Sequence, residues 1–206
     1  GTIGSLFTSR VFSPAADVAF VYEAGGNVAQ TEDGYLRQTT DGGGSWTTVW
    51  THPTTAFYSS GSWLTSFLKL SATEFWAFGI LGNIDGFSQE ANYIKTTDGG
   101  ATWSARPYFN IDGVTDDLEY ESVIQLASGR IVAGRVCQGN AAGFGQDIKV
   151  WYTDNLGTAW TKSGAFADVY HENTAKYFPA LCEVAPDVVL ASAGPTYDPI
   201  NLKRSL

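Results

Sequence analysis

The sequence predicts an all-β fold, a β-propeller of four-stranded antiparallel blades with about three and a half blades in this chain. Two observations support this prediction. The 206 residues include 23 Gly, 14% aromatic residues and only 16% charged residues, which is typical of many short strands joined by tight turns. A Gly-rich motif also recurs three times at nearly constant spacing, which is typical of radial or solenoid repetition.

The repeated motif reads TTDGGGSW at 39–46, TTDGGATW at 96–103 and YTDNLGTAW at 152–160. Its aspartates are Asp41, Asp98 and Asp154, at spacings of 57 and 56 residues. A strand-like run precedes each copy, so each copy is expected to form the turn of a β-hairpin. An Asp side chain can accept hydrogen bonds from the amides of its own turn, and Gly supplies positive φ. The aspartates are therefore expected to stabilise turns rather than to act in catalysis or metal binding.

The rest of each period supplies the other strands of a blade. The expected opening pairs are 6–13 and 18–23, 63–70 and 74–80, 122–126 and 130–137, and 178–184 and 187–192. Strands at 35–38, 93–95 and 148–151 lead into the motifs, and 200–206 lines up with 33–40. The single domain, 1–206, is thus expected to hold blades near 1–55, 56–112 and 113–168, with an incomplete blade at 169–206.

The motif residues resemble the Asp box, or BNR repeat, of sialidase-like β-propellers, which reads Ser/Thr-x-Asp-x-Gly-x-Thr/Ser-Trp. The first two copies match at every position. The third copy reads as degenerate, with Tyr152 in place of the hydroxyl residue and one inserted residue before Gly157 and Trp160. The resemblance implies a glycan-recognising propeller, or alternatively a retaining exo-glycosidase of the sialidase type.

Candidate binding residues lie in long loops that are expected at the ends of the blades opposite the motifs. Such loops on a rigid scaffold often carry function. The loops that enter the third and fourth blades are acidic and aromatic, and they hold Asp116, Tyr170, His171 and Glu172. Carboxylates can accept hydrogen bonds from sugar hydroxyls, and aromatic rings can stack on sugar faces. These four residues are therefore candidate ligand-binding residues.

The segment 120–135 resembles the sialidase blade opening, in which a Glu precedes a strand, a Gly makes the turn and an Arg follows on the second strand. By that resemblance, Glu121 would assist a Tyr nucleophile and Arg135 would bind the carboxylate of a sugar. The candidate catalytic residues are Glu121, Asp117 and Tyr120. The spacings around Gly129 are about one residue short of the family pattern, and an ordinary blade hairpin is the alternative.

The formal net charge of −9 argues against nucleic-acid and anionic-membrane partners, and no apolar run is long enough to span a membrane. No cofactor or metal site is expected, because Cys137 and Cys182 lack the spacing of zinc ligands. The two cysteines either form a disulfide or are buried thiols. The expected partners are a glycan and further propeller blades, from the same longer protein or from another chain.

Glycan binding is the leading function, on a secreted protein or on a cell or virion surface, including receptor binding. Glycoside hydrolysis is the alternative, and a structural or protein-binding propeller is a further one, since fold alone does not determine function. The sequence contains no Met, even at position 1, which suggests a processed product or a piece of a longer protein.

Overall fold

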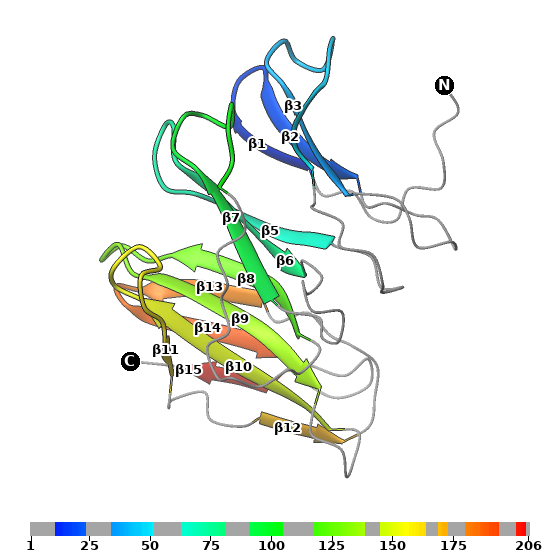
Figure 1. Ribbon diagram of the computed structural model, residues 1–206. Coiled ribbons are helices and arrows are strands. Elements are labelled where there is room, and N and C mark those ends of the chain that lie inside the picture. Colours follow the sequence, from blue (N-terminus) through cyan, green and yellow to red (C-terminus); the bar gives the residue numbers. More distant parts are fainter. Residues whose placement is uncertain are drawn as a thin grey trace. The chain divides into compact units, whose positions relative to one another are not determined.

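The structure is a computed structural model that describes residues 11–23, 34–51, 63–80, 91–104, 118–138, 145–163, 169–172, 180–193 and 201–204. In these ranges all regular structure is β, arranged in four antiparallel sheets (Figure 1). The predicted all-β class is confirmed. No helix of the described part is long and apolar enough to cross a membrane. The chain forms two compact units, Gly1–Phe109 and Asn110–Leu206, and each is described by itself.

The first unit contains two sheets, which are called sheet 1 and sheet 2. Sheet 1 has the order β1 (Val11–Ala15), β2 (Val18–Glu23), β3 (Tyr35–Thr39), β4 (Thr47–Thr51). Sheet 2 has the order β5 (Trp63–Lys69), β6 (Phe75–Ile80), β7 (Ala91–Thr96). The strand order follows the sequence, so each sheet is an antiparallel meander.

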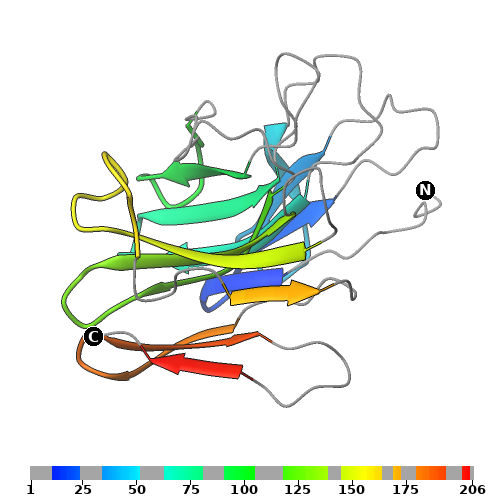
Figure 2. The same ribbon diagram turned by 90° about the horizontal axis from the view of Figure 1, so that it is seen from below.

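The second unit contains sheet 3 and sheet 4 (Figure 2). Sheet 3 has β8 (Leu118–Gln125), β9 (Ile131–Gln138), β10 (Gly145–Thr153) and β11 (Thr161–Lys162), and β12 (Val169–Glu172) also pairs with β10. Sheet 4 has β13 (Ala180–Ala185), β14 (Val188–Ala193) and β15 (Asn201–Arg204). Most expected strands agree with these bounds to within a few residues; the expected start of the first strand, at Leu6, lies outside the described residues.

The strand pairing shows which residues of the four sheets occupy equivalent positions of the repeat. The first hydroxyl residue of each motif pairs with β2, β6 or β9: Thr39 with Ala19, Thr96 with Phe75 and Thr153 with Ile131. These positions are 57 residues apart throughout. Sheet 4 aligns with sheet 1 through its first turn. Ala185 pairs with Val188 as Ala15 pairs with Val18, and Asp187 and Asp17 have φ of 58° and 60°.

The motif turns are held by the hydrogen bonds that the residue types predict. In the first turn, the Thr39 hydroxyl donates to the Asp41 carboxylate at 2.7 Å and accepts from the Gly43 amide at 2.9 Å. The amide and hydroxyl of Ser45 donate to the same carboxylate at 2.9 and 2.6 Å. The second turn repeats this set with Thr96, Asp98, Gly100 and Thr102.

These bonds lower the pKa of Asp41 and Asp98 well below the usual range. The largest cause is the side-chain hydroxyl of Ser45 or Thr102, followed by the backbone amide of the same residue. Each turn uses the carboxylate of its own aspartate. The geometry therefore agrees with the prediction that Asp41 and Asp98 stabilise turns.

The third turn corrects the sequence interpretation. Its hydroxyl residue is Thr153 rather than Tyr152, and its acceptor is Asn155 rather than Asp154. The Thr153 hydroxyl donates to the Asn155 side-chain oxygen at 2.8 Å, and the amides of Gly157 and Ala159 complete the turn at 3.1 and 2.9 Å. The motif therefore has no inserted residue, and it keeps the 57-residue spacing with Asn in place of Asp.

Each unit has its own core between its two sheets. In the first unit, Phe20, Tyr22 and Leu36 of sheet 1 pack against sheet 2 residues Phe75 and Ile94. In the second unit the core residues are Leu126, Val132, Val150, Leu181, Val189 and Ala191. Burying one such side chain contributes about 1.5–3 kcal/mol. Packing between sheets thus stabilises each unit.

Candidate functional site

Two of the predicted site residues are direct backbone neighbours in sheet 3. Tyr120 of β8 is the register partner of Arg135 of β9, and Arg135 also pairs with Lys149 of β10. The Cα atoms of directly opposite residues in antiparallel strands lie about 4.5–5.5 Å apart. The fold therefore brings Tyr120 and Arg135 together, and it adds Lys149, which the sequence analysis did not single out.

Glu121 is the extra residue of a β-bulge. The register runs from Tyr120 opposite Arg135 to Ser122 opposite Gly134, so Glu121 has no partner of its own in the ladder. Bulges redirect side chains and are over-represented next to active sites. Sheet 2 has a bulge at the same repeat position, Thr65, so the bulge itself belongs to the scaffold. A carboxylate at this position distinguishes sheet 3 from sheet 2.

These residues lie away from the third turn. Thr153, which begins that turn, pairs with Ile131, and Arg135 is four residues further along β9. At a rise of about 3.3 Å per residue, this corresponds to roughly 13 Å. Tyr120, Glu121 and Arg135 are therefore in the half of sheet 3 that is remote from the turn, where the sequence analysis expected a site.

Tyr170, His171 and Glu172 do not begin a fourth blade as expected. They form β12, which pairs with the first residues of β10: Asp147 opposite Tyr170, Gln146 opposite His171 and Gly145 opposite Glu172. The blade boundary at 168/169 is thus wrong, because Val169–Glu172 belongs to sheet 3. The physical reason is that β11 covers only the far end of β10 and leaves an edge that β12 occupies.

The position of β12 also separates these residues from Tyr120. Two strands, β9 and β10, lie between β8 and β12. At about 4.8 Å per strand, the separation is roughly 14 Å, so the expected convergence of the two groups does not occur at the backbone level. Asp116 and Asp117 lie outside the described residues.

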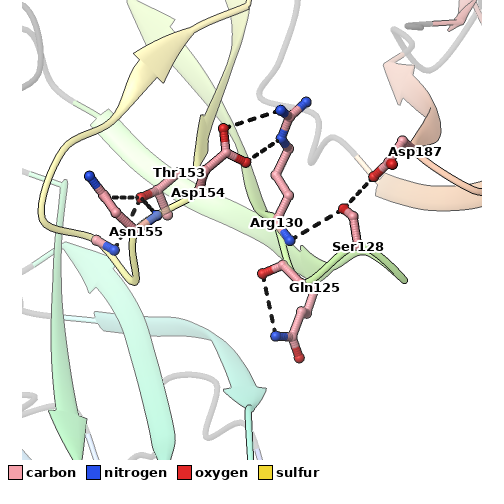
Figure 3. A network of polar contacts seen from close by, with 9 residues as sticks. Gln125, Ser128, Arg130, Thr153, Asp154, Asn155 and Asp187 are labelled. Atoms are coloured by element: carbon pink, nitrogen blue, oxygen red, sulfur yellow. Dashed lines mark hydrogen bonds and ion pairs between the residues drawn. The ribbon is translucent and has the colours of Figure 1, made fainter.

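A polar network lies at the turn end of the second unit (Figure 3). The Arg130 guanidinium donates to both carboxylate oxygens of Asp154 at 2.7 and 3.1 Å and lies 4.4 Å from the centre of the Tyr152 ring. The hydrogen bond from Arg130 lowers the pKa of Asp154. The Asp154 side chain is thus the acceptor of a surface ion pair, whereas the acceptor that closes the turn is Asn155.

Two further contacts join this network to sheet 4. The Ser128 hydroxyl donates to the Asp187 carboxylate, and the Glu183 carboxylate accepts from the amides of Ala127 and Asp187, each at 2.9 Å. The bonds from Ser128 and Ala127 hold the β8–β9 turn against sheet 4, and the bond from the Asp187 amide fixes Glu183 within sheet 4. The network is therefore structural, and it does not provide an open group for catalysis.

The sequence left the state of Cys137 and Cys182 open and predicted no metal site. In the described ranges, no group of three or more His, Cys, Asp or Glu is placed to hold a metal ion. Cys182 is a free thiol and is exposed, which corrects both the disulfide and the buried-thiol interpretation for that residue.

The sequence of the chain matches no family model and no curated protein. Solved structures do match. A protein of unknown function from Dyadobacter fermentans aligns with a TM-score of 0.62 at 13% identity over 96% of this chain and 61% of its own. Trypanosoma rangeli sialidase in complex with sialic acid aligns with a TM-score of 0.62 at 12% identity, over 98% of this chain and 36% of the sialidase.

A third structure, Penicillium chrysogenum α-L-arabinanase complexed with arabinobiose, aligns with a TM-score of 0.55 at 13% identity, over 90% of this chain and 56% of the arabinanase. This chain thus spans between about a third and three fifths of the length of these three proteins. At such identities the likeness concerns the fold alone. The chain has an all-β fold of the β-propeller type, in which the sheets described above are the blades.

Proposed function

We propose that this chain is a glycan-recognising β-propeller of the sialidase-like, Asp-box kind. The observation that carries the proposal is the fold likeness to two structures whose ligands are sugars, a sialidase with sialic acid and an arabinanase with arabinobiose. The turns at Asp41 and Asp98 support the Asp-box assignment, because each contains the motif residues and is closed by hydrogen bonds between their hydroxyl groups and the carboxylate.

The proposed binding site is the half of sheet 3 that carries Tyr120, Glu121 and Arg135. A guanidinium can donate two parallel hydrogen bonds to a sugar carboxylate, and a Tyr ring offers an apolar face with a polar tip. The backbone neighbourhood of Tyr120 and Arg135 supports this grouping. Asp116 and Asp117 precede β8 in the sequence and are proposed to contribute acceptors for hydroxyl groups. Tyr170, His171 and Glu172 are proposed to contact a ligand only if it extends across β10.

A retaining glycoside hydrolase is the second candidate. The observation that favours it is the bulge that places Glu121 between Tyr120 and Ser122, opposite Arg135 and Gly134. In this reading Tyr120 would be the nucleophile, Glu121 would accept its proton, and Asp117 would protonate the leaving group and then activate water. Binding remains the leading proposal, because the sequence supplies no second arginine that matches the family pattern.

The proposed setting is outside the cell or on a cell or virion surface, where glycans are available to the protein. Further blades, from a longer protein or another chain, are proposed as partners, since this chain spans only part of the solved structures that it resembles.

The test combines a glycan array with a fluorogenic sialoside assay on the purified chain. Selective binding without turnover is the expected result. Arg135→Ala and Glu121→Gln should each weaken binding of the array hit by about 10- to 100-fold, the effect of losing one charged hydrogen bond.

Arg130→Ala is the matched control, because its guanidinium is already paired at the turn end of the same sheet. It should leave binding unchanged. An array without hits, or an Arg130→Ala loss equal to that of Arg135→Ala, would contradict the proposed site. Turnover that survives purification and disappears in Glu121→Gln would favour the hydrolase.

A further inference from the structure

The first unit shows how one sheet of the repeat packs on the sheet before it. The Trp103 ring of the second turn lies edge-on to Phe20 of sheet 1, with ring centroids 5.7 Å apart and planes at 84°. The Gln38 side-chain amide donates to the Gly99 carbonyl at 2.9 Å. Phe67 stacks on Phe12 of sheet 1 at 5.1 Å. We call the face of sheet 2 that carries Phe67 and Trp103 its inserting face, and the face of sheet 1 that carries Phe12, Phe20 and Gln38 its receiving face.

The second unit repeats this arrangement. Leu181 of sheet 4 has the same repeat position as Phe67, since Leu181 pairs with Ala191 as Phe67 pairs with Ala77. Leu181 is buried in the core that sheet 4 shares with Val132 of sheet 3. In both units, therefore, the inserting face of the later sheet packs on the receiving face of the earlier one.

Sheet 1 has an inserting face of its own, and it is uncovered. Val11 is at the repeat position of Phe67 and Leu181, and it is 67% exposed. Trp46 is at the position of Trp103 and is 38% exposed. A Cβ on Gly43 would meet nothing within 4 Å, whereas a Cβ on Gly100, at the same position, would clash with the receiving sheet. Sheet 1 thus exposes the positions whose counterparts are partly buried in sheet 2, at Phe67 and Trp103, and buried in sheet 4, at Leu181.

Sheet 4 has an uncovered receiving face. Cys182 pairs with Leu190 as Phe12 pairs with Phe20, so these two apolar residues hold the positions that receive the next sheet. Cys182 is exposed and Leu190 is half-buried, whereas Phe20 is fully buried. Among the described residues, sheet 1 thus has an uncovered inserting face and sheet 4 has an uncovered receiving face, and these two kinds of face are complementary.

We propose that the inserting face of sheet 1 docks on the receiving face of sheet 4 of a second copy of this chain. Neither unit of this chain packs two inserting faces or two receiving faces together. The contact is therefore head-to-tail, in which different surfaces of the two copies meet, and such contacts produce rings or open chains depending on the rotation. Trp46 is the central residue of the interface, because buried aromatic residues contribute most to binding at such surfaces.

The test is analytical ultracentrifugation of the chain over a concentration series, with a reductant present so that Cys182 cannot form intermolecular disulfides. Wild type should self-associate. Trp46→Lys and Cys182→Lys should each weaken self-association at least about 30-fold, the effect of losing a dominant interface residue. Leu156→Lys is the matched control, because Leu156 is 52% exposed but lies in the third turn, on neither of the two faces. This variant should self-associate as wild type does.

Mixing the two variants distinguishes a contact between unlike faces from a contact between like faces. Trp46→Lys retains its receiving face and Cys182→Lys retains its inserting face, so an equimolar mixture should form a one-to-one dimer that grows no further. Circular dichroism melting checks that both variants are folded, and Val11→Lys replaces Trp46→Lys if that variant is not. A monomeric wild type, association that survives both substitutions, or a mixture that stays monomeric would overturn the proposal. None of these outcomes depends on glycan binding.

Discussion

Gly43 and Gly100 occupy the same position in the first and second turns, and they differ in one respect that can be measured. Both have a positive φ, 100° and 95°. A Cβ added to Gly43 would have open space, whereas a Cβ on Gly100 would lie 2.3 Å from Cζ of Phe20. Alanine at Gly43 therefore reports backbone strain alone, and alanine at Gly100 reports the same strain together with a steric clash between sheets.

The magnitudes follow from these two costs. A left-handed conformation costs a non-glycine residue about 1–2 kcal/mol, so we expect Gly43→Ala to lower the free energy of unfolding by that amount. Phe20 is fully buried, with rings of Phe75 and Trp103 5.8 and 5.7 Å away, so it cannot move aside freely. Overpacking of such a site costs about 1–3 kcal/mol more. Gly100→Ala should therefore lower the free energy of unfolding by about 2–5 kcal/mol.

The assay is urea unfolding followed by tryptophan fluorescence, with both variants and wild type at one concentration. A second background isolates the clash: in Phe20→Leu the ring atoms are gone, so the cost of Gly100→Ala should fall to that of Gly43→Ala, which a double-mutant cycle measures. Equal losses for Gly43→Ala and Gly100→Ala, within about 0.5 kcal/mol, would refute the reasoning that the second turn is packed on sheet 1, since additivity holds to that precision.

Three more predictions concern the turns. Trp103→Ala should lower the free energy of unfolding by about 3 kcal/mol, the cost of truncating a packed aromatic, with glycan binding by the folded fraction unchanged; urea titration and binding measured on the same sample check this. The folded state lowers the pKa of the Asp98 carboxylate, so the stability that this carboxylate contributes is complete above its unfolded pKa and is lost as the pH falls towards its folded pKa. The melting temperature of Asp98→Asn should therefore fall less than that of wild type between pH 7 and pH 3, as thermal melts at both pH values would measure. Restoring the third motif with Asn155→Asp and Ala159→Ser should raise the free energy of unfolding by about 0.5–1.5 kcal/mol, measured by urea titration, and no gain would mean that the Asp-to-hydroxyl bond contributes nothing here.

The repeat and most strands were predictable because their causes are local. A motif turn is closed by bonds between residues two to four apart, such as Thr96 with Asp98 and Gly100, so its residue types are sufficient to identify it. The sequence interpretation of the third turn is wrong because Asp154 follows a Thr, as Asp41 and Asp98 do, and so aligns with them by local similarity. The hydroxyl residue, Thr153, was the better guide, and a constant spacing of 57 residues was the signal that identifies it.

The candidate site was less predictable. Tyr120, Glu121 and Arg135 were selected by resemblance, and only strand pairing shows that Tyr120 and Arg135 are opposite each other and that Glu121 is a bulge residue. The course of β12 could not be predicted either, because it depends on how much of β10 is left uncovered by β11 rather than on the residues of β12.

The sequence by itself determined the strand class, the period and the bonding of the turns, because hydrogen bonds between neighbours in the chain depend only on nearby residue types. The tertiary structure alone decided which of several equivalent apolar positions is buried. Val11 and Leu181 hold the same repeat position, yet one is exposed and the other is in a core. The difference arises because burial depends on whether another sheet is present, and that sheet comes from residues far away in the chain.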